Sequence, residues 1–211
     1  MNFLTIEPNN GFATLLLAHG AGGAMDTSAM QKSAEALAGV GFRVARFEFQ
    51  YMAARRDGVR KPPPRADKLI GEYRYAVDAL DTRGPLFVGG KSMGGRVASM
   101  VADELHAEGK ISGLVCLGYP FHPPDKPENL RTGHLKGLQA PTLICQGSRD
   151  PFGTREEVAA YELSDRIDIF WLEDGDHDLK PRKRISGFTA SDHLASMAER
   201  TADWAKRVIA P

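Results

Sequence analysis

Short apolar segments alternate with longer helical patterns along almost the whole chain, and this alternation limits the folds open to it. Runs such as TLLLAHG and TLICQG have the length of buried strands and are short for buried helices. Strands that alternate with helices form βαβ units, so the pattern predicts an α/β fold: a doubly wound, mostly parallel sheet with helices on both faces. The expected strands are residues 14–20, 42–49, 86–90, 111–118, 141–147 and 167–173, with 3–7 as an edge strand, and the expected helices are 26–39, 66–81, 93–108, 154–162 and 190–209.

The size and charge of the chain exclude several classes of protein. A length of 211 residues with no repeat or linker predicts a single domain over residues 1–211. The formal net charge of zero gives no overall attraction to nucleic acid. No apolar run approaches the roughly 20 residues that span a bilayer, and the first residues lack the pattern of a signal peptide. We therefore expect a cytoplasmic protein without a membrane or nucleic-acid partner, in which Cys116 and Cys145 are reduced core residues.

The segment GKSMG, residues 90–94, follows an apolar run, precedes a helical pattern and fits the motif G-x-S-x-G. In this motif a serine occupies a strained turn between a strand and a helix, where Gly90 and Gly94 leave room for close backbone contacts. The alternatives are a glycine-rich turn that binds nothing and a turn that binds a phosphate. The pattern of a phosphate-binding loop requires glycine at the position of Pro85. The context therefore favours Ser92 as a nucleophile.

A serine nucleophile requires a base, and the base requires an acid that orients it. The expected chain order for this turn is serine, then acid, then histidine. Asp150 follows the apolar run TLICQG, and His177 follows the last predicted strand, so both lie at carboxyl ends of strands in that order. His122 is the rival base, because the loop that contains it also reaches this edge of the sheet.

Two main-chain N–H groups are expected to stabilise an oxyanion. One belongs to Met93, the residue after the predicted nucleophile. The other is assigned to Ala21, in the glycine-rich segment HGAGG after the first buried strand. This chemistry requires neither a metal nor a cofactor.

With these motifs the sequence resembles the α/β-hydrolase family. The resemblance rests on HGAGG, GKSMGG, GSRD and GDH and covers nearly the whole chain. The segments GKSMGGR, YMAARRDGVRKPPPR and GYPFHPP look like a small lidless bacterial branch near the dienelactone hydrolases, itself related to eukaryotic hydrolase-like proteins, some of them chromatin-complex subunits. The resemblance implies Ser92, Asp150 and His177 as a catalytic triad. Dienelactone hydrolases have a cysteine where this chain has Ser92, which argues against dienelactone as the substrate.

Two basic loops, residues 55–65 and 180–184, follow predicted strands and are expected at the rim of the site. One interpretation is a solvated, charge-mixed rim. The other is that Arg55 and Arg56 hold an anionic group of the substrate, because guanidinium groups pair well with carboxylates and phosphates. His122 is expected beside them.

These patterns together predict a serine hydrolase that acts on a small-molecule ester or thioester, and the second interpretation of the basic loops adds a preference for small anionic substrates. The alternative is a non-catalytic binding or scaffold protein with the same fold. The patterns specify neither the acyl group nor an oligomeric state, and they assign no role to Lys91.

Overall fold

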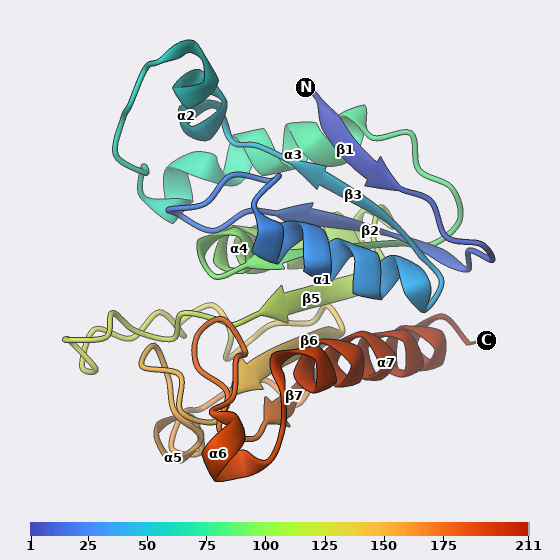
Figure 1. Cartoon of the computed structure of the whole chain (residues 1–211). Helices are drawn as coiled ribbons and strands as arrows, with labels where there is room; N and C mark the ends of the chain where they lie inside the picture. The colour runs from blue at the N-terminus through green and yellow to red at the C-terminus, as the bar shows by residue number, and fades with distance from the viewer. Residues whose placement is uncertain (211) are drawn as a thin grey trace.

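A computed structural model describes residues 1–210 as a twisted sheet with helices on both sides (Figure 1). The sheet has seven strands in the order β1-β3-β2-β4-β5-β6-β7. The first strand is antiparallel to its neighbour, and all other pairs are parallel. The strands are β1 (Phe3–Ile6), β2 (Ala13–Ala18), β3 (Phe42–Phe47), β4 (Leu86–Lys91), β5 (Gly113–Leu117), β6 (Thr142–Gly147) and β7 (Ile167–Leu172).

Two helices cover each face of this sheet. Helices α1 (Ser28–Gly39) and α7 (Ala190–Ile209) pack together on the near face, and α3 (Ile70–Ala79) and α4 (Met93–Ala107) lie on the far face (Figure 1). Successive residues of β2 alternate between the two cores, with Leu15 and Leu17 facing α1 and α7 and Leu16 facing the other layer. Burial on both faces explains why the central strands are continuous apolar runs.

A distortion in β4 lies just before the predicted nucleophile. The buried hydroxyl of Tyr73, from α3, donates to the carbonyl of Gly89 at 2.7 Å and accepts from the N–H of Gly89 at 2.9 Å. The peptide groups of Gly89 therefore turn toward the helical layer. A Cβ added to Gly89 would lie 1.9 Å from the carbonyl oxygen of Val115 in β5, so only glycine fits this position.

Most predicted elements are present, and the helix predicted for residues 154–162 is the main error. It ends after one turn, as α5 (Arg155–Val158). Beyond Val158 the backbone tightens into i→i−3 bonds, which bring the ring of Tyr161 against Phe121, with centroids 5.9 Å apart. The end of the helix thus allows the Tyr161 ring to be partly buried against the core.

Besides α5 and the longer helices, residues 1–210 contain four short helical turns, three of them in segments expected to be irregular. They are α2 (Gln50–Ala53), the 3₁₀ turns η1 (Ala54–Asp57) and η2 (Ala66–Leu69), and α6 (Lys183–Ser186). The turn η2 begins the segment that was predicted to be helical from residue 66, so the α-helix there is shorter than expected.

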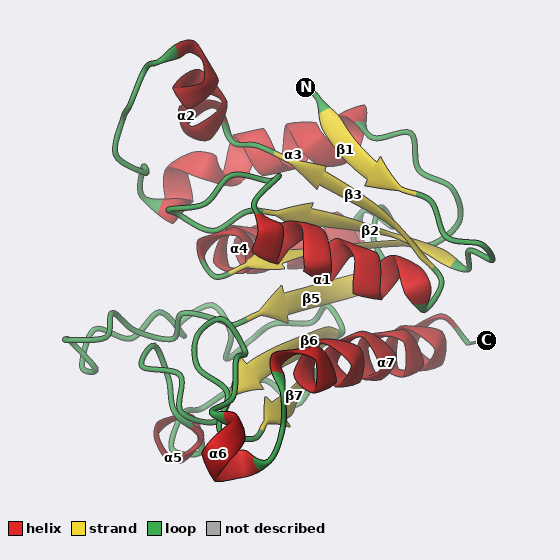
Figure 2. Cartoon of the chain, in the orientation of Figure 1, coloured by secondary structure: helices red, strands yellow, loops and turns green. Residues whose placement is uncertain are grey.

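Long loops gather at the carboxyl edge of the parallel strands (Figure 2). The connection between β5 and β6, residues 118–141, contains no helix or strand, so no lid domain covers this edge. Among residues 1–210, none of the helices combines the length and apolar character needed to cross a bilayer.

Candidate active site

Ser92 forms the turn between β4 and α4 and has a strained backbone. Its φ of 51° and ψ of −117° lie in a backbone region that residues other than glycine rarely adopt. A Cβ on Gly90 or on Gly94 would lie 2.5 Å from the carbonyl oxygen of Ala18 in β2. The two motif glycines are therefore required by the close approach of β2 to the turn.

A chain of hydrogen bonds connects Ser92, His177 and Asp150. The Nε2 atom of His177 lies 2.8 Å from the Oγ of Ser92, and its Nδ1 lies 2.8 Å from Oδ2 of Asp150. Asp150 is fully buried and also accepts from Gln146 Nε2 at 2.9 Å and from the N–H of Phe152 at 2.8 Å. Because a carboxylate accepts, Nδ1 carries the ring proton, which leaves Nε2 free to accept the serine proton.

The orientation of the His177 ring is also fixed by packing. The Phe152 ring lies against it, with centroids 4.2 Å apart and planes inclined by 32°. Since the imidazole is held by a ring on one side and by two hydrogen bonds in its plane, its rotation is restricted.

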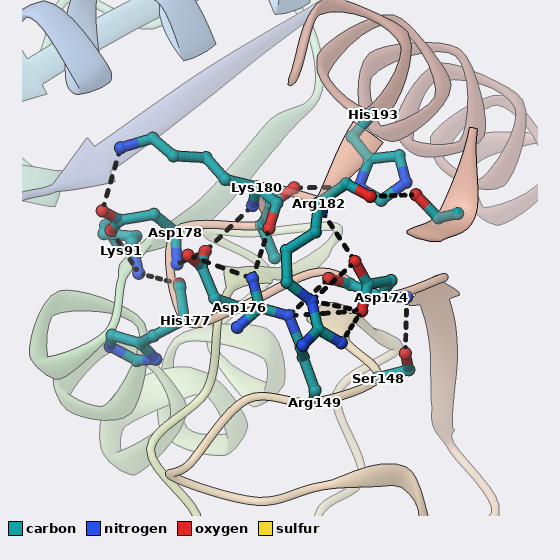
Figure 3. Close-up of polar contacts among 12 residues, drawn as sticks. Lys91, Ser148, Arg149, Asp174, Asp176, His177, Asp178, Lys180, Arg182 and His193 are labelled. Carbon is teal, nitrogen blue, oxygen red and sulfur yellow. Dashed lines mark hydrogen bonds and ion pairs between the residues drawn. The ribbon is translucent and has the colours of Figure 1, made fainter. Parts of the chain in front are cut away.

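His177 lies in a loop of residues 173–182, called the histidine loop below, which is fixed by ion pairs (Figure 3). At its base Asp174, with a φ of 55°, accepts from the main-chain N–H of Arg182 at 2.7 Å and from its Nε at 3.0 Å. The side chain of Arg149 donates to the carbonyl of Asp174 at 2.8 Å and to that of Lys180 at 3.1 Å. Arg149 and Arg182 thus hold the two ends of the loop together.

Hydrogen bonds with Arg182 lower the pKa of Asp174 to about 2. A carboxyl whose pKa is lowered by folding stabilises the fold above its ordinary pKa of 3.8 and loses that contribution as the pH falls toward 2. The base of the loop therefore stays paired at neutral and mildly acidic pH.

Further contacts order the tip of the histidine loop. Oδ1 of Asp176 accepts from the N–H groups of Asp178 at 2.9 Å and Lys180 at 3.0 Å, and His193 Nδ1 lies 2.9 Å from the carbonyl of Leu179. The loop is therefore a rigid support for the His177 ring.

A cavity of about 560 Å³ opens over Ser92 and His177. Its lining is mainly apolar and comes from the first turns of α1 and α7, the glycine loop after β2 and the histidine loop. The side chains and backbone that line it include Ala21, Ala29, Met30, Lys32, Lys91, Ser92, Leu117, Phe152, His177, Leu179, Lys180 and Leu194. This volume is within the range of small-molecule sites.

The two predicted oxyanion donors lie beside the serine. A Cβ on Gly20 would be 3.8 Å from that of Ser92, so the glycine loop contacts the turn, and Ala21 follows at the cavity wall. The loop is held by Tyr51, whose hydroxyl donates to the Ala21 carbonyl at 2.9 Å. Within residues 1–210, the N–H groups of Ala21 and Met93 donate to no main-chain carbonyl, so both remain available to a ligand.

The expectation that Arg55 and Arg56 lie at the rim of the site and hold an anionic group of the substrate finds no support in the structure. Neither residue lines the cavity over Ser92. Arg56 is paired with Glu48 at 2.7 Å and Asp26 at 2.9 Å, and these carboxylates neutralise it. Arg55 lies over the ring of Tyr51, 5.8 Å from its centroid.

His122 does not contact the predicted nucleophile or the cavity either. It is buried, and its Nδ1 lies 2.8 Å from the carbonyl of Pro123, while its Nε2 lies 3.4 Å from a carboxylate oxygen of Glu157. Both ring nitrogens are therefore engaged away from Ser92, so neither of the roles considered for His122 fits its position.

Sequence reasoning missed Lys32 as a residue of the cavity wall. It lies on α1, and only the packing of that helix over β2 brings it to the site. Lys180 belongs to the second basic loop and does reach the cavity, as expected for that segment. No local sequence pattern identifies Lys32 as a cavity residue, because lysine is common on exposed helix faces.

Comparison with known proteins is consistent with this geometry. A family model described as an alpha/beta hydrolase domain matches residues 11–206. Similar solved structures include a Xanthomonas campestris protein described as an α/β serine hydrolase without lid, at 16% identity and a TM-score of 0.71 over 97% of this chain and 88% of that one. A dienelactone hydrolase from Anabaena variabilis matches at 20% identity and a TM-score of 0.65, over 96% of this chain and 89% of that one. An esterase domain from Rhodothermus marinus matches at 18% identity and a TM-score of 0.63, over 98% and 99%. At these identities the likeness to solved structures concerns the fold.

Proposed function

Because the chain belongs to the α/β-hydrolase family, we propose that it is a serine hydrolase that cleaves a small carboxylic ester or thioester as a single domain of residues 1–211. The observation that carries this proposal is the chain of two hydrogen bonds, each 2.8 Å long, from Ser92 through His177 to Asp150 at the floor of an open cavity. A serine linked in this way to a base and a buried acid can be activated as a nucleophile.

In the proposed mechanism, Ser92 Oγ attacks the substrate carbonyl while His177 Nε2 accepts the serine proton. Asp150 keeps the ring in the correct tautomer and stabilises the imidazolium that forms. The N–H groups of Ala21 and Met93 donate to the oxyanion of the tetrahedral intermediate. His177 then gives its proton to the departing alcohol or thiol, which leaves an acyl group on Ser92. A water molecule, deprotonated by His177, hydrolyses that acyl-enzyme and restores the serine.

A fluorophosphonate probe tests this function directly. The folded wild-type chain is expected to gain one phosphonyl group on the peptide that contains Ser92, and mass spectrometry of the digested protein locates it. A His177→Ala variant should react far more slowly, because the serine loses its base. A wild-type chain that stays unlabelled while folded would favour the alternative, a non-catalytic binding or scaffold protein.

The cavity supports a preference for substrates that combine an apolar acyl group with an anionic group. Its wall is mainly apolar, and Lys32 and Lys180 are exposed at its edge. The ammonium of Lys180 lies 3.2 Å from a carboxylate oxygen of Asp178, whereas no carboxylate of residues 1–210 lies within ion-pair distance of Lys32. Lys32 is therefore the better candidate for binding an anion.

Replacing Lys32 with alanine is expected to raise KM about two- to fivefold for esters that carry a carboxylate, because an exposed ion pair contributes about 1 kcal/mol or less. KM for a neutral ester of equal length should not change. Steady-state kinetics on such a substrate pair gives the comparison, with Arg60→Ala as a control from the basic loop that the cavity does not include. Equal effects of Lys32→Ala on both esters would remove the case for anion binding.

A further inference from the structure

Lys91 is the residue immediately before Ser92, and it lines the cavity over that serine. Only 18% of the side chain is exposed. Its Nζ donates a hydrogen bond to the main-chain carbonyl of His177 and lies 3.6 Å from Oδ1 of Asp178 (Figure 3). The ammonium therefore connects the end of β4 to the histidine loop, and the reaction steps given above do not involve it.

The place where Lys91 meets the histidine loop is enclosed by the end of β5. Gly118 has a φ of 65°, and a Cβ there would lie 2.6 Å from the carbonyl oxygen of His177 and 3.0 Å from the Nζ of Lys91. The N–H of Gly118 is held by the carbonyl of Cys145 at 2.9 Å. Three separate segments thus form the surroundings of this ammonium, and a side chain at position 118 would displace either the lysine or the histidine backbone.

The charges around Lys91 also favour contact between its ammonium and the histidine loop. Burial lowers the pKa of Lys91, and the neighbouring carboxylate of Asp178 opposes that effect. A mostly buried ammonium needs partners for its N–H groups, and within this structure the His177 carbonyl and Asp178 provide them. Loss of the lysine would leave the His177 carbonyl without its donor.

We propose that Lys91 is a positioning residue, whose ammonium fixes the distance between His177 and Ser92 by holding the main chain of the histidine. This inference rests on the proposed serine hydrolase. Lys91 and Ser92 are covalent neighbours, and the carbonyl and ring of His177 belong to one residue. The contacts from Lys91 Nζ to the carbonyl and from Ser92 Oγ to Nε2 therefore attach His177 to the nucleophile turn at two points. A second attachment limits the movement of the ring relative to the hydroxyl.

Lys91 also lines the cavity, so a direct role in binding an anionic substrate is the competing explanation. The two roles differ in kinetics. A positioning residue affects the chemical step and lowers kcat, whereas a residue that only binds the substrate raises KM for anionic esters.

The test is a Lys91→Met variant, which keeps the length of the side chain and removes its donors and charge. For a neutral ester, kcat and the rate of fluorophosphonate labelling are expected to fall about 10- to 100-fold, with KM within twofold, because small misplacements of reacting groups have effects of this size. Lys110→Met is the matched control: Lys110 also pairs with two carboxylates, those of Asp78 and Glu108, but lies beyond the far end of α4. Its kcat should remain at the wild-type value.

A chemical rescue separates positioning from loss of fold. Aminoethylation of a Lys91→Cys variant restores an ammonium of nearly the same length, and Cys116 and Cys145 are buried and shielded from the reagent. We expect the modification to restore most of kcat. If Lys91→Met does not fold, Lys91→Gln, whose amide can still donate to the His177 carbonyl, is expected to lower kcat relative to the wild type, by less than the 10- to 100-fold predicted for Lys91→Met.

An unchanged kcat in a folded Lys91→Met variant, or a rise in KM for anionic esters alone, would overturn the proposal. The ¹⁵N resonances of the His177 ring provide a readout that requires no substrate, and identical resonances in the wild type and Lys91→Met would also overturn it. Failure of the wild type itself to react with the fluorophosphonate would contradict the proposed function, which is a different result.

Discussion

Replacing Ser92 with alanine is expected to lower kcat for any ester that this chain hydrolyses by about 10⁴- to 10⁶-fold, since loss of a triad serine removes the covalent route. The thermal unfolding midpoint should change little. Alanine has the same Cβ as serine, so the strained backbone at φ 51° is retained, and only the hydroxyl and its bond to His177 are lost. Initial rates with a chromogenic ester and a thermal melt of the same preparation measure the two effects.

Ser99→Ala is a closely matched control. The Oγ of Ser99 also lies 2.8 Å from a histidine nitrogen, Nε2 of His134, so both serines have the same hydroxyl–imidazole contact. Ser99 is buried within α4, donates to the carbonyl of Arg96 at 2.7 Å and does not line the cavity. Its alanine variant should keep kcat within about twofold. Comparable activity in the Ser92 and Ser99 variants would exclude Ser92 as the nucleophile.

Replacing Gly89 with alanine is expected to cost about 3 kcal/mol or more of unfolding free energy, or to prevent folding. The new methyl group would lie 1.9 Å from the carbonyl oxygen of Val115, in the backbone of a central strand that cannot shift without breaking its ladder. Movement of β4 away from β5 would also break the two hydrogen bonds that Gly89 makes with the Tyr73 hydroxyl. Chemical denaturation, with the midpoint and slope compared between variant and wild type, measures the loss.

Gly71→Ala makes the same chemical change but is expected to raise the unfolding free energy rather than lower it. Gly71 lies in the first turn of α3, and a Cβ there meets nothing within 4 Å. Alanine should raise the unfolding free energy by about 0.5–1 kcal/mol, because it favours helix and restricts the unfolded chain. If both alanine variants were equally stable, close packing against Val115 could not be the reason that position 89 requires glycine.

The order of elements could be predicted from the sequence because apolar runs and capped helices are local signals. The C-terminal helix was predicted at 190–209 and is observed as α7 over the same residues, where Thr189 and Asp192 form a capping box. Ser92, Asp150 and His177 could be selected because each follows a strand, and parallel strands end at one edge. The structure brings them together as expected, and their catalytic role remains our proposal.

Contacts between distant segments were beyond sequence reasoning. Arg56 is a basic residue in a basic loop, and nothing local shows that Glu48 and Asp26 neutralise it. Lys91 had no assigned role because its partner, the His177 carbonyl, is 86 positions away. Lys32 reaches the cavity only through helix packing. In each case the identity of the partner depends on the fold rather than on the neighbouring residues.

The positions of Ser92 and His177 in the sheet have a consequence for how the proposed activity would be lost under stress. Ser92 follows β4, the central strand, which has three strands on each side, whereas His177 follows β7 at the edge of the sheet. Edge strands with partly exposed side chains open locally at lower free energy than the centre of a sheet. Local opening of β7 would carry His177 away from Ser92 while the remaining strands stay folded. We therefore expect sub-global unfolding at this edge to abolish the proposed activity at temperatures or denaturant concentrations below those that unfold the core.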